Sequence, residues 1–198
     1  MSLQKQAKTL TNKQIDIVLN YLQTTRDTLR NEVIFLLSVK GGLRAIEIAS
    51  LKWNHLIDTD SNISNTISLT NDISKGKRGG RLIPINKVLK QKLIEYYDIK
   101  KKNHYFDISD NLIHTQRSKS TTPQCIVNMF QIWYKDLNLI GCSSHSGRRT
   151  AITNWSRKIT TVGGSLKDVQ QLAGHSSLKT TSLYIEGNEN SKLMVVDL

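Results

Sequence analysis

The C-terminal stretch that decides the fold reads His145-Ser146-Gly147-Arg148-Arg149-Thr150, then, after a helical run, Leu172-Ala173-Gly174-His175-Ser176-Ser177, and then Tyr184. It gathers two imidazoles, two guanidinium groups and a phenol in a short segment that is otherwise largely apolar. Groups of these kinds suit chemistry on an anion better than they suit packing in a core. The stretch therefore predicts a phosphoryl-transfer site.

Helical periodicity surrounds the first part of this stretch. Arg148, Ile152, Trp155 and Ile159 fall on one side of a helix that begins at His145. His145 and Arg148 should therefore project from neighbouring points near the helix start. The backbone N–H groups and the positive dipole end of a helix N-terminus favour an anion at that place.

A second helix is predicted in the middle of the stretch, with clear signals at both ends. Ser165 and Asp168 have the spacing of a capping box, and Gly174 is a C-terminal stop. Ser177 can begin a last short helix that carries Tyr184.

Upstream of this stretch, the pattern predicts further helices. Thr11 can N-cap the first, whose apolar residues have one-face spacing. The second, over residues 29–37, is apolar on most sides and should be a central, buried helix. Gly41-Gly42 ends it, and the residues from 43 to 51 start a third helix.

Arg44 stands in the first turn of that third helix, among residues that are expected to be buried. A buried arginine needs a partner, and Glu47 lies one turn further on, within i,i+3 reach. The sequence therefore predicts an internal ion pair, which by itself would be only structural.

The middle of the chain changes to a period of two. Residues 66–70 and 81–85 read as strands, the second as an edge strand. The turn between them is rich in glycine and carries Lys75, Lys77 and Arg78. The simplest interpretation is a β-hairpin with a positively charged tip, which is either solvated surface or a contact for a DNA groove or phosphate.

Two more helices complete the pattern. Asn86 can cap one that leads into Lys100-Lys101-Lys102, and Thr122-Pro123 can start the other. The sequence assigns no element to residues 103–120 and predicts a surface loop at 159–164. The expected fold is mainly α-helical with a small antiparallel β-sheet.

The composition favours a polyanionic partner. The chain has 198 residues, and Lys+Arg 28 against Asp+Glu 16 gives a net charge of +12 and a pI near 9.8. Nucleic acid is the first candidate for the partner. A generally basic soluble protein remains the plain alternative.

Other classes of protein are disfavoured. Cys125 and Cys142 have neither C-x-x-C nor secreted-type spacing, so free thiols in a reducing cytoplasm are expected. The histidines lack metal-ligand spacing, so we expect neither a metal nor a cofactor. Residues 1–10 lack the apolar core of a signal peptide, and no apolar run approaches the roughly 18 residues of a membrane span. A soluble, cytoplasmic protein without a membrane partner is predicted.

The ordered set of motifs resembles that of the tyrosine recombinases, the phage integrase family of DNA strand-exchange enzymes. The pieces that match are Gly-Leu-Arg44-x-x-Glu47, a lysine in a basic hairpin before Leu82-Ile83-Pro84, His145-x-x-Arg148, Leu172-x-Gly174-His175-Ser176, and Tyr184. Each piece alone is weak, but their order is specific. The resemblance implies the family's catalytic-domain fold, a mostly helical domain with a small antiparallel sheet.

The resemblance also implies roles for the basic residues. Arg44 and Arg148 would clamp the non-bridging oxygens of the scissile phosphate, and Glu47 would support Arg44 from behind. His145 and His175 would donate further hydrogen bonds or handle protons.

Tyr184 would be the nucleophile that forms a 3′-phosphotyrosyl link, without metal or ATP. Lys75 would protonate the departing 5′-hydroxyl. Lys77 competes for that role, because the hairpin, counted back from Arg81, is one residue longer than in the family. Arg149 stands where many relatives have a histidine and, like Lys77 and Arg78, would contact DNA.

By this resemblance, residues 11–198 would be the catalytic domain with its C-terminal tail, and residues 1–10 a basic lead-in or linker. The chain would then be either a minimal recombinase without a separate DNA-clamping domain, like the short enzymes that invert fimbrial promoter segments, or a fragment of a longer protein. The expected partner is double-stranded DNA at a specific recombination site. Residues 188–198 would dock on a neighbouring subunit, giving a tetramer on DNA.

Other hypotheses compete with a recombinase. A DNA-binding accessory protein of the same fold, without strand cleavage, would be marked by loss of Arg44, Arg148 or Tyr184, and all three are present. A type IB topoisomerase shares the chemistry but normally has additional DNA-encircling regions. Singly, His145 could be a helix cap, and His175 and Tyr184 could be core residues.

Overall fold

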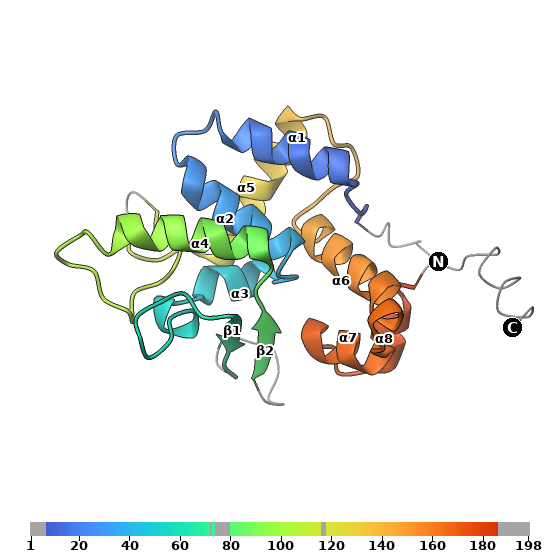
Figure 1. Ribbon diagram of the computed structural model, residues 1–198. Coiled ribbons are helices and arrows are strands. Elements are labelled where there is room, and N and C mark those ends of the chain that lie inside the picture. The colour runs from blue at the N-terminus through green and yellow to red at the C-terminus, as the bar shows by residue number, and fades with distance from the viewer. Residues whose placement is uncertain (1–6, 72, 74–79, 116–117, 186–198) are drawn as a thin grey trace, which may run out of the picture. The chain divides into compact units, whose positions relative to one another are not determined.

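The computed structural model describes residues 7–71, 73, 80–115 and 118–185 (Figure 1). It contains two compact units, Met1–Ala151 and Ile152–Leu198. The elements of the first unit are α1 (Asn12–Leu22), α2 (Thr28–Val39), α3 (Ala45–Ser50), a 3₁₀ turn (Trp53–His55), β1 (Thr66–Leu69), β2 (Arg81–Pro84), α4 (Lys87–Lys100), α5 (Pro123–Asp136) and the start of α6 (Ser146–Lys158). The mainly helical fold with a two-stranded antiparallel sheet is confirmed.

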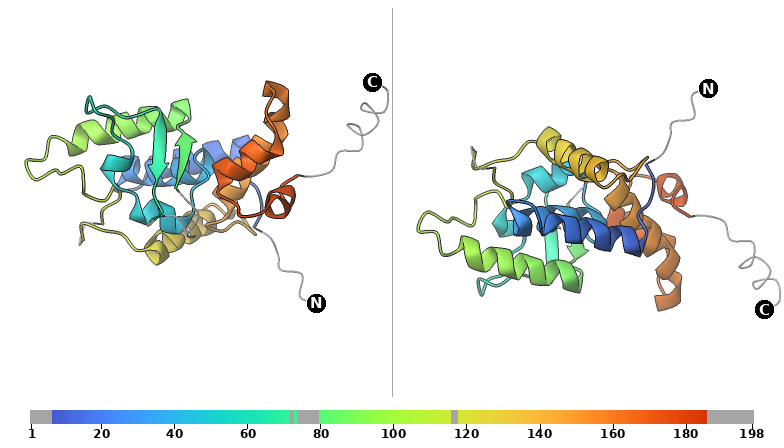
Figure 2. Two further views of the ribbon diagram at one scale, coloured as in Figure 1. Left: turned by 90° about the horizontal axis from the view of Figure 1, so that it is seen from below. Right: turned by 90° about the horizontal axis from the view of Figure 1, so that it is seen from above.

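Helix α2 forms the centre of the first unit. It packs against α1, α3 and α4 (Figures 1 and 2), and every residue from Asn31 to Val39 is buried. Burying a large apolar side chain contributes about 1.5–3 kcal/mol, so this helix supplies much of the core. Phe35 packs on Phe130 of α5, with ring centroids 6.4 Å apart. The prediction of a central, buried helix is confirmed.

The capping residues predicted for the starts of three helices are confirmed. The Thr11 hydroxyl accepts a hydrogen bond from the Gln14 N–H, and Asn86 and Thr122 cap α4 and α5 in the same manner. Pro123 occupies the first turn of α5, where its missing N–H costs nothing.

The predicted β-hairpin is present. Strands β1 and β2 are antiparallel, with Thr66 opposite Pro84 and Leu69 opposite Arg81. Ile67 and Ile83, which face each other, are buried, so one face of the hairpin belongs to the core. Its tip, with most of the basic turn, lies outside the described residues.

The end of the predicted lead-in is packed rather than loose. The Lys8 N–H donates to the Gly141 carbonyl at 3.1 Å, and the Leu10 N–H donates to the Thr150 hydroxyl at 2.7 Å. Leu10 itself is buried in the main core. Residues Lys8 to Leu10 therefore belong to the folded first unit.

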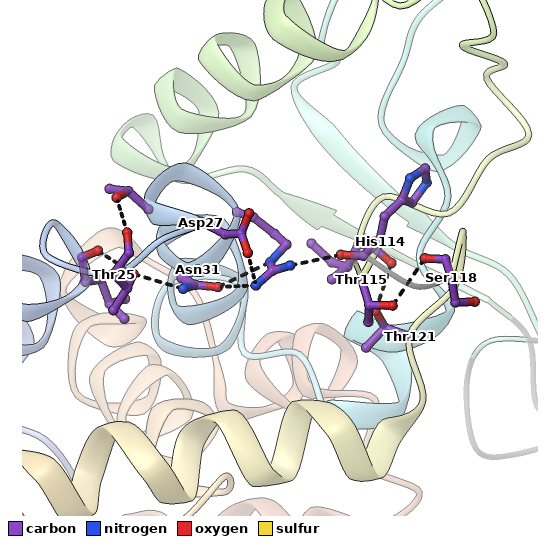
Figure 3. A network of polar contacts seen from close by, with 11 residues as sticks. Thr25, Asp27, Asn31, His114, Thr115, Ser118 and Thr121 are labelled. Atoms are coloured by element: carbon purple, nitrogen blue, oxygen red, sulfur yellow. Dashed lines mark hydrogen bonds and ion pairs between the residues drawn. The ribbon is translucent and has the colours of Figure 1, made fainter.

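The segment that the sequence left unassigned is held by polar contacts with the start of α2 (Figure 3). Arg30 pairs with Asp27 at 3.0 Å and donates to the His114 carbonyl at 3.2 Å. The Thr121 hydroxyl donates to the Ile113 carbonyl, and Ile113 is buried. Contacts between residues far apart in the sequence fix this segment, and they include backbone hydrogen bonds from Trp53 and Asn54 to the carbonyls of Asp110 and Ile108.

The second unit continues α6 and adds a 3₁₀ turn (Thr160–Val162), α7 (Leu166–Ala173) and α8 (Leu178–Ser182). Its small core consists of Ile152, Val169 and Ala173, with Trp155, Ile159, Leu166 and Tyr184 packed against it. The segment predicted as a surface loop at 159–164 is exposed for the most part, but it is wound into the 3₁₀ turn.

Candidate active site

Arg44 follows a tight turn between α2 and α3. Gly42 in this turn has a φ of 65°, a backbone conformation that favours glycine. Arg44 is the N-cap residue of α3, with φ −78° and ψ 157°. It therefore lies just before the first turn of the helix in which it was predicted. The reason is that the Glu47 carboxylate accepts from the Arg44 N–H at 2.8 Å, as in a capping box, so Arg44 takes the cap position.

Glu47 binds two arginines from a fully buried position. The predicted ion pair with Arg44 is present, with Arg44 Nη1 at 2.9 Å from Glu47 Oε1. Arg81 Nη1 is also 2.9 Å from Oε1, and Arg81 Nη2 is 3.0 Å from Oε2. Burial by itself raises the pKa of Glu47, but the hydrogen bonds and charges of Arg81, together with those of Arg44, lower it below the ordinary value.

Arg81 was not predicted as a site residue. It read only as the first residue of a strand. A signal was available, because Arg81 and Ile83 lie on the same face of β2 and Ile83 is buried. A cation on a core-facing position needs an anion, and Glu47 is the anion that the fold provides.

Arg148 lies beside the turn that leads to Arg44. The residue as a whole is 5% exposed, and Nη1 donates to the Gly42 carbonyl. The close approach of α6 to α2 makes this possible, since a Cβ at Gly147 would lie only 2.4 Å from the Ser38 hydroxyl oxygen. The first unit thus brings Arg148 into contact with Gly42, which precedes Arg44 by two positions in the sequence. That the two arginines share an anion site stays a prediction.

His145 directly precedes α6. Its carbonyl accepts the hydrogen bond from the Arg149 N–H at 2.8 Å, and its own N–H donates to the Ser143 hydroxyl. The His145 side chain is exposed, whereas Arg149 is half-buried. His145 is therefore the residue before the helix rather than the first residue of the helix.

His175 and Tyr184 lie together in the second unit. Gly174, with a φ of 62°, ends α7 as predicted, and the His175 N–H donates to the Gln170 carbonyl. His175 Nδ1 lies 3.0 Å from the hydroxyl of Thr181, which is buried. The rings of His175 and Tyr184 stack, with centroids 5.4 Å apart and an interplanar angle of 25°.

Tyr184 lies just beyond α8 rather than in it. The helix ends at Ser182, and the Tyr184 N–H donates to the Thr181 carbonyl in the turn that follows. Its ring packs half-buried against the small core of the second unit. Ser177 caps α8 as predicted, through a hydrogen bond from the Lys179 N–H.

Several predicted site residues fall outside the described residues, namely Lys75, Lys77, Arg78 and the tail segment 188–198. The choice between the two lysines stays a prediction. Within the described ranges, no group of three His, Cys, Asp or Glu side chains could hold a metal ion. No described helix is long and apolar enough to cross a membrane.

The arrangement suits a tetrahedral anion. Arg44 has 28% of its side chain exposed, and it holds Glu47 through one guanidinium nitrogen. Arg148 approaches the same turn. Two permanently charged forks stabilise charge that spreads over the oxygens of a phosphate. In the second unit, an imidazole and a phenol lie in ring contact.

The chain belongs to the phage integrase family, whose sequence profile matches residues 8–191. A curated relative is the tyrosine recombinase XerC of Chlamydia caviae, which is 30% identical over 177 residues. That alignment covers 88% of this chain and 53% of the relative. The chain thus spans about half the length of the curated relatives that it matches.

Solved structures share the fold. The Tn1549 transposon integrase, in complex with circular intermediate DNA, has a TM-score of 0.73 at 22% identity, over 98% of this chain and 66% of that chain. The XerH site-specific recombinase, bound to its difH substrate in a pre-cleavage complex, has a TM-score of 0.72 at 19% identity. That likeness covers 100% of this chain and 56% of XerH.

Proposed function

We propose that this chain is the catalytic domain of a site-specific DNA recombinase, which cleaves and rejoins strands through a 3′-phosphotyrosyl intermediate. The observation that carries the proposal is the contact of Arg148 with the turn that directly precedes Arg44. Arg148 donates to the carbonyl of Gly42, and Arg44, two residues further on, is tethered to Glu47. Family membership and the DNA-bound state of the related integrase and XerH structures support it.

The chemistry follows from the charges. The phenol oxygen of Tyr184 attacks the scissile phosphorus, and the bond from phosphorus to the 5′ oxygen breaks. Arg44 and Arg148 stabilise the negative charge on the non-bridging oxygens. The product is a phosphotyrosyl link and a free 5′-hydroxyl. Since the link preserves a phosphoester, a hydroxyl of a second strand can reverse the step without ATP.

Proton transfer requires further groups. A phenol with a pKa near 10 is a weak nucleophile at neutral pH, so its proton needs an acceptor and its oxygen needs nearby positive charge. We assign proton handling to His175, which stacks on Tyr184, and hydrogen bonding at the phosphate to His145. Lys75 delivers a proton to the departing 5′ oxygen. Lys77, Arg78 and Arg149 bind the DNA backbone.

The substrate that we propose is double-stranded DNA at a specific recombination site, reached in the cytoplasm at the nucleoid. Assembly is proposed to be a tetramer on DNA, held by the tail segment 188–198. The high positive charge of the chain supports a polyanionic partner.

The direct test is the capture of a covalent adduct. Nicked duplexes, tiled across the DNA that flanks the coding region, trap a cleaved strand because the short end diffuses away. The expected result is a denaturant-resistant protein–DNA band with one duplex, whose phosphopeptide contains Tyr184. Failure of every duplex to react, while a known recombinase reacts with its own site, would contradict the proposal.

Two variants locate the nucleophile. Tyr184→Phe removes the attacking oxygen and is expected to abolish the adduct. Tyr105→Phe is the matched control, since Tyr105 is 79% exposed in the first unit and should react like the unsubstituted chain. An adduct that persists in Tyr184→Phe would place the nucleophile elsewhere.

A further inference from the structure

The Glu47 carboxylate is shared unequally between its two arginines. Arg81, from β2, binds both oxygens with a guanidinium fork, at 2.9 Å and 3.0 Å. Arg44, from α3, binds with one guanidinium nitrogen at 2.9 Å and with its backbone N–H at 2.8 Å. Arg81 therefore binds Glu47 through two guanidinium nitrogens, whereas Arg44, the N-cap residue of α3, uses only one.

The two arginines also differ in burial, and this decides which of them neutralises the charge of Glu47. Glu47 is fully buried, the Arg81 side chain is 10% exposed, and the Arg44 side chain is 28% exposed. A buried carboxylate needs a cation, and Arg81 is the more buried of the two. The three groups together carry one net positive charge. Because Arg81 neutralises Glu47, that charge remains with the more exposed Arg44.

We propose that Arg81 is a positioning residue for Arg44. By occupying both oxygens of Glu47, it prevents Arg44 from turning its own fork onto the carboxylate, so that the other guanidinium nitrogens of Arg44 can bind the scissile phosphate. This inference rests on the proposed function. If Arg81 were absent, Arg44 would bind both oxygens of Glu47 with its own guanidinium group. Arg44 would then no longer be available to the phosphate.

The kinetic test uses Arg81→Gln, which removes the charge, and Arg81→Lys, which keeps the charge but lacks the planar fork. Arg26→Gln is the matched control, since it also removes one positive charge, from an exposed residue in the turn between α1 and α2. With the duplex that reacts in adduct capture, strand cleavage by Arg81→Gln is expected to slow about 100-fold, as for a misplaced catalytic group. Arg81→Lys should recover only part of the rate, and Arg26→Gln should cleave normally.

A substrate with a methylphosphonate at the scissile position separates positioning from general structural damage. This group lacks the negative charge that Arg44 neutralises. The defect of Arg81→Gln relative to the unsubstituted chain should therefore shrink at least tenfold on it, as should that of Arg44→Ala. A defect of the same size on both substrates, full recovery in Arg81→Lys, or normal cleavage by Arg81→Gln would overturn the inference.

An NMR measurement without DNA tests the inference independently of the proposed function. The arginine Nε–H signals of the ¹⁵N-labelled chain report the guanidinium environment, and Arg44→Lys identifies the signal of Arg44. Arg81→Gln and Arg81→Lys should shift that signal, whereas Arg26→Gln should leave it in place. An unmoved signal in both Arg81 variants would overturn the positioning role, even if no duplex reacted with the unsubstituted chain.

Discussion

Glu47 keeps its negative charge inside the protein because two arginines surround it. Its pKa is lowered despite burial, through the hydrogen bonds and charges of Arg81 and Arg44. The carboxyl group in an unfolded chain has a pKa of about 4.3. Since the folded-state value is lower, the network contributes its full stability above the unfolded-state pKa and loses it as the pH falls through the folded-state pKa.

The prediction is an acid-side loss of stability that depends on Glu47. Urea unfolding between about pH 7 and pH 3 should show the free energy of unfolding falling with pH in the unsubstituted chain. The Glu47→Gln variant, although less stable at neutral pH, should lose less on acidification because position 47 no longer titrates. Glu95→Gln, at a half-exposed site, should keep the steeper profile. Equal acid losses in the Glu47 and Glu95 variants would contradict the assignment.

A modified DNA substrate can identify which residue acts as the general acid. A 5′-thiol leaving group needs little protonation, so a substrate with sulfur at the bridging position should rescue the loss of the acid. We expect at least a tenfold larger recovery of strand cleavage for Lys75→Ala than for Arg44→Ala.

Lys77→Ala provides the matched comparison, two positions further along the chain. It should show a weaker defect with ordinary DNA and no selective rescue by the thiol substrate. Rescue of Lys77→Ala in place of Lys75→Ala would transfer the general-acid role to Lys77.

At the scale of elements, the position of Arg148 depends on a close contact between the end of α2 and the first turn of α6. Gly147 lies against Ser38, whose hydroxyl is buried without a hydrogen-bond partner among the described residues. Gly147→Ala would place a methyl group 2.4 Å from that oxygen, so either the Ser38 side chain must rotate or the two helix ends must move apart. Overpacking of this kind costs about 1–3 kcal/mol. It should also slow strand cleavage, because Arg148 is the next residue.

Ser38→Ala is the compensating change. It removes the oxygen that the new methyl group meets, and should itself cost little because that oxygen has no hydrogen-bond partner in the described part of the chain. Thermal unfolding of the two single variants and the double variant should show a non-additive recovery of at least about 0.5 kcal/mol, the size expected for residues in contact. Strict additivity would show that the crossing tolerates the extra methyl group by other means.

Element starts and ends were largely predictable from the sequence because their signals are local. A capping residue and the N–H group that it binds are two or three positions apart, as at Thr11, Asn86, Thr122 and Ser177. The hairpin was predictable from the alternation of its strands. The segment 103–120 was not, since its anchors, such as the contact of Arg30 with the His114 carbonyl, join residues far apart in the sequence.

The site was predictable only in part for the same reason. The pair of Arg44 and Glu47 has helical spacing and was found, whereas Arg81 is 34 residues from Glu47 and was missed. Finding it requires knowing which face of β2 meets α3. The resemblance to a family led only to the expectation that Arg44 and Arg148 bind the same phosphate. The contact of Arg148 with the Gly42 carbonyl, 106 residues away, follows from no local pattern.

At the scale of the whole molecule, assembly on DNA is the property that we expect the C-terminal tail to control. A chain that ends at Gly187 lacks the segment proposed to dock on a neighbour, while it keeps the arginines and Tyr184. We expect it to bind a single half-site within about twofold of the full chain but to lose the slowest-migrating complexes on a two-half-site duplex.

The matched control replaces the apolar Leu193, Met194, Val195 and Val196 with serine in the full chain. It should show the same loss of higher complexes as the shortened chain. Unchanged assembly in both proteins, measured by light scattering of the DNA complexes, would remove the tail from the interface.

The stack of His175 on Tyr184 has a consequence for observing the reaction. Each ring lies in the magnetic shielding zone of the other, at 5.4 Å and 25°. The carbon-bound protons of both rings should therefore resonate upfield of their random-coil positions in the NMR spectrum of the unreacted chain. In the proposed mechanism the phenol leaves this stack to attack phosphorus, so the upfield shifts should disappear when the reactive duplex is bound, and their loss would report the step before strand cleavage.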